Sequence, residues 1–214
     1  MNLSSFPAWL LRHKLKASLF VSVSLAVYLG IFLMQPPAVA DLSTGNRHYA
    51  STLIEKWGSG EIIVLFRHLE RCDKGYAPCL EGTKGITARS VEEGLELRED
   101  FYQLGMANTD VHNSPLDRTA QSEAIIFDDV GIDQDWLWQC PDDVLQQALD
   151  TKQPGRNLVL VTHSSCIKRF KAALGYEDER PKYGTSVFFA ENPEGPLQVL
   201  GFLDAEDWEP TLGF

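Results

Sequence analysis

Two short runs of apolar residues constrain the fold of this chain more than any other feature. They cover residues 61–66 (EIIVLF) and 157–162 (NLVLVT), and neither alternates between polar and apolar positions. Continuous runs of this kind are typical of strands buried on both faces, as in the parallel sheets of α/β proteins. Segments with helical periodicity separate and follow them, so we expect an α/β fold with a mostly parallel sheet.

The remaining elements can be placed around these two strands. Helical periodicity or helix-start signals predict helices over 87–104 and 117–127, from Pro141 onward, and from Ser164 or Ser165 onward. Residues 109–113 read as a short strand, and 186–190 and 197–203 as an antiparallel pair. Residues 41–60 look like a polar lead-in with one short helix, and residues 72–86 like a loop. The predicted architecture is a three-layer sandwich with helices flanking the sheet.

The first 40 residues differ in character from the rest of the chain. They contain three basic and no acidic residues, an uncharged run over 17–34, and an ending of Ala38-Val39-Ala40. This pattern is typical of a secretory signal peptide, cleaved here after Ala40. The run is 18 residues long, near the lower limit for a spanning helix, so a membrane tether through residues 17–34 is the alternative. We expect export, with residues 41–214 as the folded domain in the periplasm or cell envelope.

All four cysteines lie after this segment. An even number of cysteines in an exported chain predicts two disulfides. We favour Cys72–Cys79, a short loop closure, together with Cys140–Cys166, although the sequence alone does not choose among the three pairings. Free buried thiols are an alternative, and a zinc site is disfavoured because the chain has no CxxC pair.

The charge balance excludes one class of partner. The chain has a net charge of -11, which becomes -14 without the three basic residues of the leader. Non-specific binding of nucleic acid requires a face rich in Lys and Arg, so we expect no nucleic-acid partner.

Histidines and arginines follow the two buried strands. Arg67 and His68 come directly after the first strand, and His163 directly after the second. Because ligands of open parallel sheets bind beyond the carboxyl ends of the strands, the two histidines are expected to face one crevice. Arg71 follows His68 closely, and Arg118 follows the strand at 109–113. Guanidinium groups match phosphate oxygens in charge and shape, so these residues predict an anion site.

This set of residues favours phosphoryl transfer. A neutral histidine can attack phosphorus and form a covalent intermediate, which water then hydrolyses. The arginines would hold the phosphoryl oxygens, and the second histidine would donate a proton to one of them. Such a reaction requires no metal or other cofactor, and its substrate would be a small phosphorylated molecule.

Three motifs then carry a resemblance. Arg67-His68-Leu69-Glu70 resembles the RHG(E) motif of the histidine phosphatase (phosphoglycerate mutase-like) superfamily, the segment Ser114 to Gln121 resembles its S-x-x-x-R-T-x-Q helix start, and Val161 to Ser165 its V-T-H-G-G segment. The order and spacing agree over about residues 61–175. The cysteine positions and LFRHLERCD are more narrowly similar to the periplasmic lipopolysaccharide core heptose(II)-phosphate phosphatase family.

The resemblance implies residue roles and a substrate class. It implies export, His68 as nucleophile, His163 as second histidine, and Arg67, Arg71 and Arg118 as phosphate ligands. A lipopolysaccharide sugar phosphate would be the substrate. The superfamily fold it implies is the same three-layer α/β sandwich.

The chain also departs from the superfamily pattern. Leu69 replaces a glycine, Ser164 and Ser165 replace a Gly-Gly pair, and Gln139 stands where many members have a catalytic glutamate. The general acid is therefore unassigned. The candidates are carboxylates that could equally be surface groups, namely Glu70, Asp73, Asp142 and Asp143. A phosphate-binding protein without turnover is the second functional hypothesis.

Overall fold

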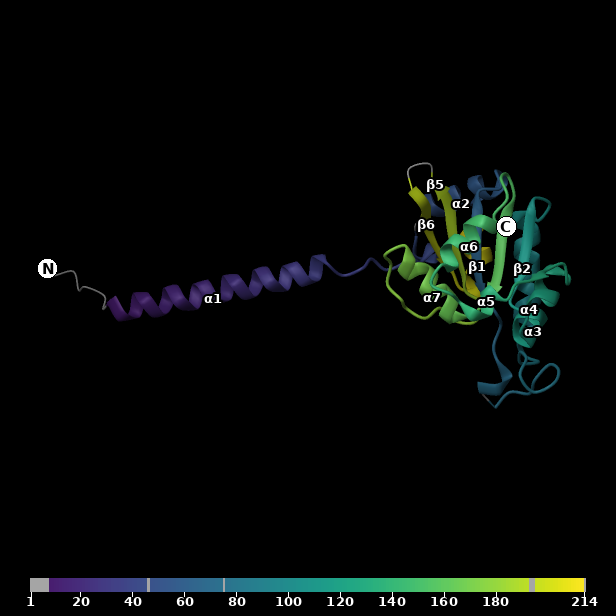
Figure 1. The fold of residues 1–214 in the computed structure, drawn as a ribbon, viewed down its shortest axis with the longest axis horizontal. Coiled ribbons are helices and arrows are strands. Elements are labelled where there is room, and N and C mark those ends of the chain that lie inside the picture. The colour runs from purple at the N-terminus through teal and green to yellow at the C-terminus, as the bar shows by residue number, and fades with distance from the viewer. Residues whose placement is uncertain (1–7, 46, 75, 193–194, 214) are drawn as a thin grey trace. The chain divides into compact units, whose positions relative to one another are not determined.

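The computed structural model describes residues 8–45, 47–74, 76–192 and 195–213. The chain forms two units, one that ends at Pro37 and one over Ala38–Phe214. In the first unit, helix α1 spans Ala8–Leu33 (Figure 1). None of the helices among the described residues combines the length and apolar character needed to cross a membrane. The second unit already includes Ala40, whose carbonyl accepts a hydrogen bond from the Phe202 amide at 2.9 Å.

The second unit is built around a six-stranded sheet in the order β3-β2-β4-β1-β5-β6. The strands are β1 (Ile62–Arg67), β2 (Thr109–Asn113), β3 (Ile132–Asp133), β4 (Asn157–Thr162), β5 (Ser186–Asn192) and β6 (Gly195–Leu203). The first four strands in spatial order are mutually parallel, and β5 and β6 add an antiparallel pair at one edge. The mostly parallel sheet predicted from the sequence is confirmed.

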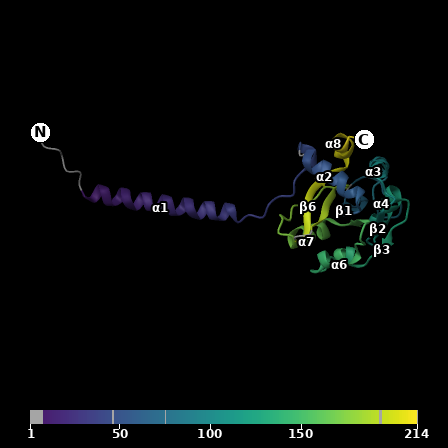
Figure 2. The same ribbon diagram turned by 90° about the horizontal axis from the view of Figure 1, so that it is seen from above.

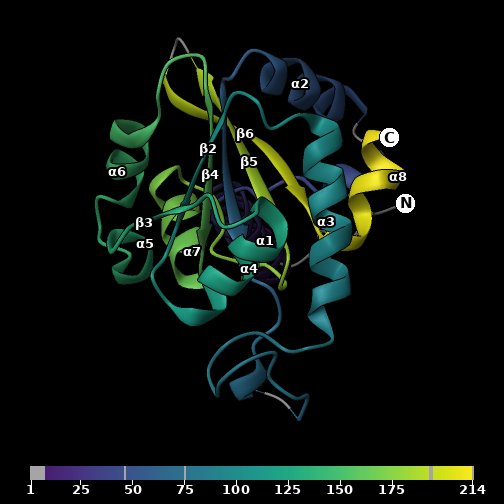
Figure 3. The same cartoon turned by 90° about the vertical axis from the view of Figure 1, so that its right-hand side faces the viewer.

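Helices cover both faces of the sheet (Figures 2 and 3). One face packs against α2 (Arg47–Gly58), α3 (Ser90–Leu104), α4 (Asp117–Phe127) and α8 (Trp208–Leu212). The other face packs against α5 (Trp136–Gln139), α6 (Val144–Thr151) and α7 (Ser164–Ala173). Single turns of 3-10 helix occur as η1 (Leu42–Thr44), η2 (Cys72–Lys74) and η3 (Ala205–Asp207).

The central position of strand β1, between helices on both faces of the sheet, explains why its sequence is continuously apolar. Its side chains alternate between the two hydrophobic clusters, with Val64 and Phe66 in one and Ile63 and Leu65 in the other. All six of its residues are buried, so no position along the strand faces water. A strand of this kind stabilises both layers of the sandwich at once.

The prediction for residues 41–60 is wrong in one respect. This segment is part of the core, because Leu53 and Trp57 on α2 are buried and the Trp57 indole donates to the Gly105 carbonyl at 2.6 Å. The mainly polar composition of α2 hides this buried stripe. The sequence pattern does not predict the short helices α5 and α8, and the helix expected from Pro141 begins at Val144 after a turn.

Candidate active site

The two histidines predicted to face one crevice lie side by side. Strands β1 and β4 are parallel neighbours, with Arg67 in register with Thr162, so the next residues along each strand are His68 and His163. The His68 amide donates to the Thr162 carbonyl at 3.1 Å. The two imidazole rings are 5.3 Å apart between centroids and inclined by 62°. Pairing of the strands therefore places both rings at one end of the sheet.

His68 is held in one tautomer by the backbone. Its Nδ1 lies 2.7 Å from the carbonyl oxygen of Leu69, an atom that can only accept a hydrogen bond. Nδ1 therefore carries the proton, and Nε2 keeps its lone pair. Burial holds the pKa of His68 well below its ordinary value, and His163, Arg118 and Arg67 lower it further against the Leu69 hydrogen bond. The ring is neutral at physiological pH and bears an unprotonated Nε2.

His163 is neutral for related reasons. Burial lowers its pKa to about 3, and the charges of Arg118, Arg71 and Arg67 act in the same direction. Its Nε2 lies 2.8 Å from the hydroxyl of Ser114, which is itself fully buried. Its Nδ1 is buried and has no hydrogen-bond partner in the described part of the protein.

Arg67 and Arg118 present guanidinium nitrogens that other protein groups do not satisfy. Arg67 stacks on the ring of Tyr183 at 3.8 Å from its centroid, and one of its terminal nitrogens donates to the Pro181 carbonyl. Arg118 lies in the first turn of α4. The Nε atoms of both arginines are buried without a hydrogen-bond partner among the described residues. Burial lowers the pKa of each guanidinium, yet both stay charged because the ordinary pKa of arginine lies far above neutral pH.

These groups line a common cavity of about 360 Å³. Four arginines contribute to its wall, namely Arg67, Arg71, Arg118 and Arg180. The other lining residues are His68, Trp138, His163, Ser164 and Ser165. None of the nine is acidic, although the whole chain carries a net charge of -11. The cavity therefore concentrates positive charge of the kind that can hold an anion such as phosphate.

All four candidate acids lie outside this lining, and Glu70 and Asp73 are held in ion pairs. The Glu70 carboxylate pairs with Arg89 and accepts a hydrogen bond from the Thr87 hydroxyl at 3.0 Å, so its pKa is lowered. Asp73 pairs with Arg71 at 2.5 Å, and this contact lowers its pKa too. Both groups are ionised at neutral pH, as expected for the surface ion pairs that the sequence also allows. Neither contact supports a role as general acid.

Leu69 shows how the chain accommodates its departure from the RHG pattern. The side chain is fully buried in a hydrophobic cluster, and its amide donates to the Ser122 hydroxyl at 3.0 Å. Gly94 on α3 lies directly opposite, since a Cβ atom there would come within 2.8 Å of a Leu69 methyl carbon. The leucine side chain at residue 69 thus fits because Gly94 has no side chain. Gln139 lies at the end of α5 and is exposed, and its neighbour Trp138 lines the cavity.

Arg180, which lines the cavity, and two residues that contact its lining, Tyr183 and Ser114, could not be assigned from the sequence. Arg180 stands in the charged segment EDER, which reads as solvated surface, and Tyr183 follows it on the same loop. Ser114 enters the sequence pattern only as part of a motif, and its contact with His163 joins two strands that are distant in the sequence. No local pattern identifies these partners.

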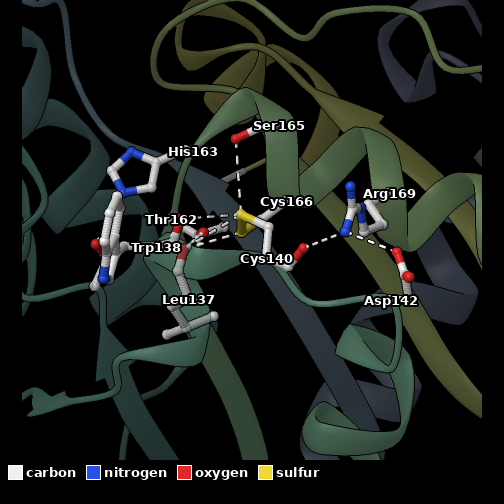
Figure 4. The surroundings of a disulfide bond; sticks show 10 residues. Leu137, Trp138, Cys140, Asp142, Thr162, His163, Ser165, Cys166 and Arg169 are labelled. Carbon is white, nitrogen blue, oxygen red and sulfur yellow. Dashed lines mark hydrogen bonds and ion pairs between the residues drawn. A yellow bond between two sulfur atoms is a disulfide. The ribbon is translucent and has the colours of Figure 1, made fainter.

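Both expected disulfides are present. Cys72–Cys79 closes the loop after β1, and Cys140–Cys166 joins the end of α5 to the first turns of α7. Figure 4 shows the second bridge with Leu137, whose carbonyl accepts a hydrogen bond from the Thr162 hydroxyl at 2.7 Å and lies beside the Cys166 sulfur. Two residues that line the cavity are close to its cysteines in the sequence: Trp138 lies two residues before Cys140, and Ser165 lies directly before Cys166. The bridge therefore ties together two walls of the site.

One group of carboxylates within the described residues has the spacing of metal ligands. It comprises Asp204, Glu206 and Asp207, whose oxygens lie within 4.8 Å of one another. The Lys182 ammonium already contacts this group, at 2.7 Å from Asp204 and 3.3 Å from Glu206. None of the three carboxylates lines the cavity that holds the histidines, so they contribute nothing to its chemistry.

Comparisons with known proteins agree with the fold and with the resemblance. No family model matches the chain. Lipopolysaccharide core heptose(II)-phosphate phosphatase of Escherichia coli O9:H4 (strain HS) is 34% identical over 111 residues, which is 50% of this chain and 54% of that protein. The same-named protein of Escherichia coli O139:H28 is 32% identical over 109 residues, with the same shares. The matched stretch thus covers about half the length of these curated relatives.

Several of the solved structures that share this fold are named as phosphatases. A phosphoserine phosphatase from Entamoeba histolytica matches with a TM-score of 0.54 at 14% identity, covering 68% of this chain and 98% of that one. The protein histidine phosphatase SixA, in complex with tungstate, matches with a TM-score of 0.53 at 13% identity, covering 67% of this chain and 97% of that one. At such identities the likeness concerns the fold alone. The predicted phosphoglycerate mutase-like architecture is confirmed.

Proposed function

We propose that this chain, which has the fold of the histidine phosphatases, is an exported phosphomonoesterase that works through a phosphohistidine on His68. One observation carries the proposal: the ring with an unprotonated Nε2 lies in a cavity lined by four arginines and by no carboxylate. A lone nucleophilic nitrogen among positive charges suits attack on an anionic phosphoryl group.

In the first step, Nε2 of His68 attacks phosphorus. The P–N bond forms as the bond between phosphorus and the ester oxygen breaks, and the electron pair of that bond leaves with the oxygen. The Leu69 carbonyl stabilises the positive charge that develops on the ring, because it accepts the Nδ1 proton. The leaving oxygen takes its proton from water, since no acidic side chain lines the cavity.

The arginines and His163 hold the phosphoryl oxygens during this step. Arg67 and Arg118 offer the buried Nε–H groups that have no partner among the described residues. The charges of Arg67 and Arg118 lower the pKa of His163. A bound phosphoryl group would cancel much of this positive charge and so raise the pKa of His163 again. His163 can then donate from Nδ1 to an oxygen whose negative charge grows. In the second step water attacks phosphorus, the P–N bond breaks with its electron pair returning to Nε2, and a proton of the attacking water neutralises the hydroxide left by the first step, so that inorganic phosphate and neutral His68 remain.

The substrate that we propose is a sugar phosphate of the lipopolysaccharide core. The curated relatives carry that substrate in their name, and the resemblance to their family rests on the segment around His68 and on the cysteine positions. Export is proposed on the composition of residues 1–40 and on the two disulfides, which are stable in an oxidising compartment.

Turnover by the full-length protein tests the activity. Release of inorganic phosphate would be measured from p-nitrophenyl phosphate, from sugar phosphates and from purified lipopolysaccharide with a phosphorylated core. His68→Ala is the blank, and His112→Gln on β2, outside the cavity lining, is a matched control for loss of a histidine. Phosphate release by wild type and by His112→Gln, with none by His68→Ala, is expected. Equal rates for wild type and His68→Ala would reject the proposal.

A binding protein without turnover is the second candidate. The observation that favours it is the lack of any carboxylate in the cavity lining to protonate a leaving group. Such a protein would be stabilised by phosphate or vanadate while it released no phosphate from any substrate and trapped no phosphohistidine.

Fractionation of the cell tests export. The proposed signal peptide predicts a periplasmic protein whose N-terminal residue is Asp41, and mass spectrometry of the purified protein identifies that residue. A full-length chain in the membrane fraction indicates a tether through residues 17–34 instead. A full-length chain in the cytosol would contradict export.

A further inference from the structure

A second basic cavity adjoins the one that holds the histidines. It measures about 510 Å³ and is lined by Arg67, Arg71, Lys74, Arg180 and Tyr183. Three of these residues, the arginines, also line the histidine cavity, so the two spaces share a wall. Four of its five lining residues are cationic and none is acidic.

Two of these cations are not balanced by neighbouring carboxylates. Arg180 and Lys74 form no ion pair within the described part of the chain, whereas Arg71 already pairs with Asp73 at 2.5 Å. Arg180 follows Glu177 and Glu179 in the sequence and lines a third pocket together with them, but neither glutamate lines the second cavity or pairs with Arg180 among the described residues. Unpaired positive charge persists here in a protein with a net charge of -11.

The loops that carry these cations are fixed in place. Lys74 ends η2, a turn that begins at Cys72 and is closed by the Cys72–Cys79 disulfide. Arg71 pairs with Ile86 in a backbone bridge across the same loop. The residue after Arg180 is tied to the site as well, because the Pro181 carbonyl accepts a hydrogen bond from Arg67. A constrained set of cations of this kind is preorganised for an anion.

A phosphoryl group seated between His68 and His163 needs only the first cavity. We propose that the second cavity is a subsite for a further anionic group of the substrate, a phosphate or a carboxylate on the same sugar as the scissile phosphate. This inference rests on the proposed function for the placing of the scissile phosphate. The subsite would make the protein select sugars with two anionic groups over sugars with one.

Binding measurements on a variant without the nucleophile test the subsite independently of catalysis. Affinities of full-length His68→Ala would be measured by calorimetry for glucose 1-phosphate, glucose 1,6-bisphosphate and glucuronic acid 1-phosphate, which differ only in the group at C6. A preference of about tenfold or more for either sugar with two anionic groups is expected from one added charge-assisted contact. The comparison of these two sugars shows whether phosphate or carboxylate fits better.

Further variants then show which residues produce the preference for sugars with two anionic groups. In the same background, Lys74→Gln and Arg180→Gln are expected to reduce the ratio of affinities toward one. Lys84→Gln is the matched control, because Lys84 is an exposed lysine of the same loop that lines neither cavity. Its ratio is expected to equal that of the parent.

The outcomes distinguish this inference from the proposed function. If all three sugars bind equally, or if Lys74→Gln and Arg180→Gln leave the ratio unchanged, the subsite is rejected whatever the turnover of the wild type. If the preference is found while the wild type hydrolyses nothing, the subsite stands and the proposed activity fails.

Discussion

Ser114 and His163 form a buried contact of 2.8 Å that joins the segment after β2 to the end of β4. The serine hydroxyl can donate to Nε2 of the imidazole, and a neutral His163 then carries its proton on Nδ1, the ring nitrogen without a partner among the described residues. Ser114 would therefore act as a positioning residue, which selects the tautomer of His163.

Ser114→Ala tests this role. Removing the hydroxyl frees His163 to populate both tautomers, so kcat is expected to fall about 10- to 100-fold with a smaller change in KM. Nitrogen NMR of His163 reports the tautomer directly and would not respond to a merely structural serine. Ser114→Thr, which keeps a hydroxyl, is expected to restore the Nδ1–H form. An unchanged tautomer in Ser114→Ala would contradict the assignment.

The low pKa of His163 predicts a dependence of stability on pH. Its folded-state pKa of about 3 lies below the ordinary value of about 6.5, so the unfolded chain binds a proton more readily than the folded one. The contribution of neutral His163 is fully present above about pH 6.5 and decreases as the pH falls toward about 3. At pH 4.5 the loss would be about 2 kcal/mol, to within a factor of two.

A difference measurement isolates this effect from other titrating groups. Burial raises the pKa of Glu93 to about 7 and that of Asp100 to about 6, and these carboxyl groups change stability in the opposite direction. Urea unfolding at pH 7.5 and pH 4.5 would be compared for wild type and His163→Gln. Relative to the variant, the wild type should lose stability at the lower pH. A constant difference would show that His163 titrates normally in the fold.

Leu69 and Gly94 are expected to be energetically coupled. Leu69→Ala leaves a cavity in the core and should lower the free energy of unfolding by about 2–4 kcal/mol. Gly94→Ala places a methyl group within 2.8 Å of the Leu69 side chain, so it should displace the residue next to His68 and lower both stability and kcat. In the double variant the clash with Leu69 is removed while the contact at 2.8 Å with a methyl group of Ile125 stays, so the cost of Gly94→Ala should be smaller than in the single variant but not zero. Additive effects in this cycle would contradict direct packing.

The two disulfides should differ in their consequences. Replacing Cys140 and Cys166 by serine releases a loop of 26 residues and should cost about 3 kcal/mol of stability. It also frees the segments that carry Trp138 and Ser165, so kcat should fall with it. Replacing Cys72 and Cys79 opens a loop of only seven residues and should cost less. Urea unfolding and phosphatase assays on the two double variants check the order; the reverse order would contradict it.

The sequence predicts the sheet and the two histidines well because both are local signals. A run such as NLVLVT identifies a buried strand by itself, and parallel pairing then brings the next residues together. Arg180 and Ser114 could not be assigned in this way, because their roles depend on contacts with residues that are distant in the chain. The extent of helix α2 is hard to predict because three buried side chains, Ala50, Leu53 and Trp57, stabilise a helix whose other positions are mainly polar.

The covalent intermediate tests the central claim most directly. The full-length protein would be mixed with a 32P-labelled sugar phosphate, quenched with alkali within milliseconds and digested for mass spectrometry. We expect an acid-labile, alkali-stable phosphoryl group on the peptide that contains His68, formed at a rate no slower than turnover and absent from His68→Ala. Turnover without this label, or label on His163 instead, would contradict the account.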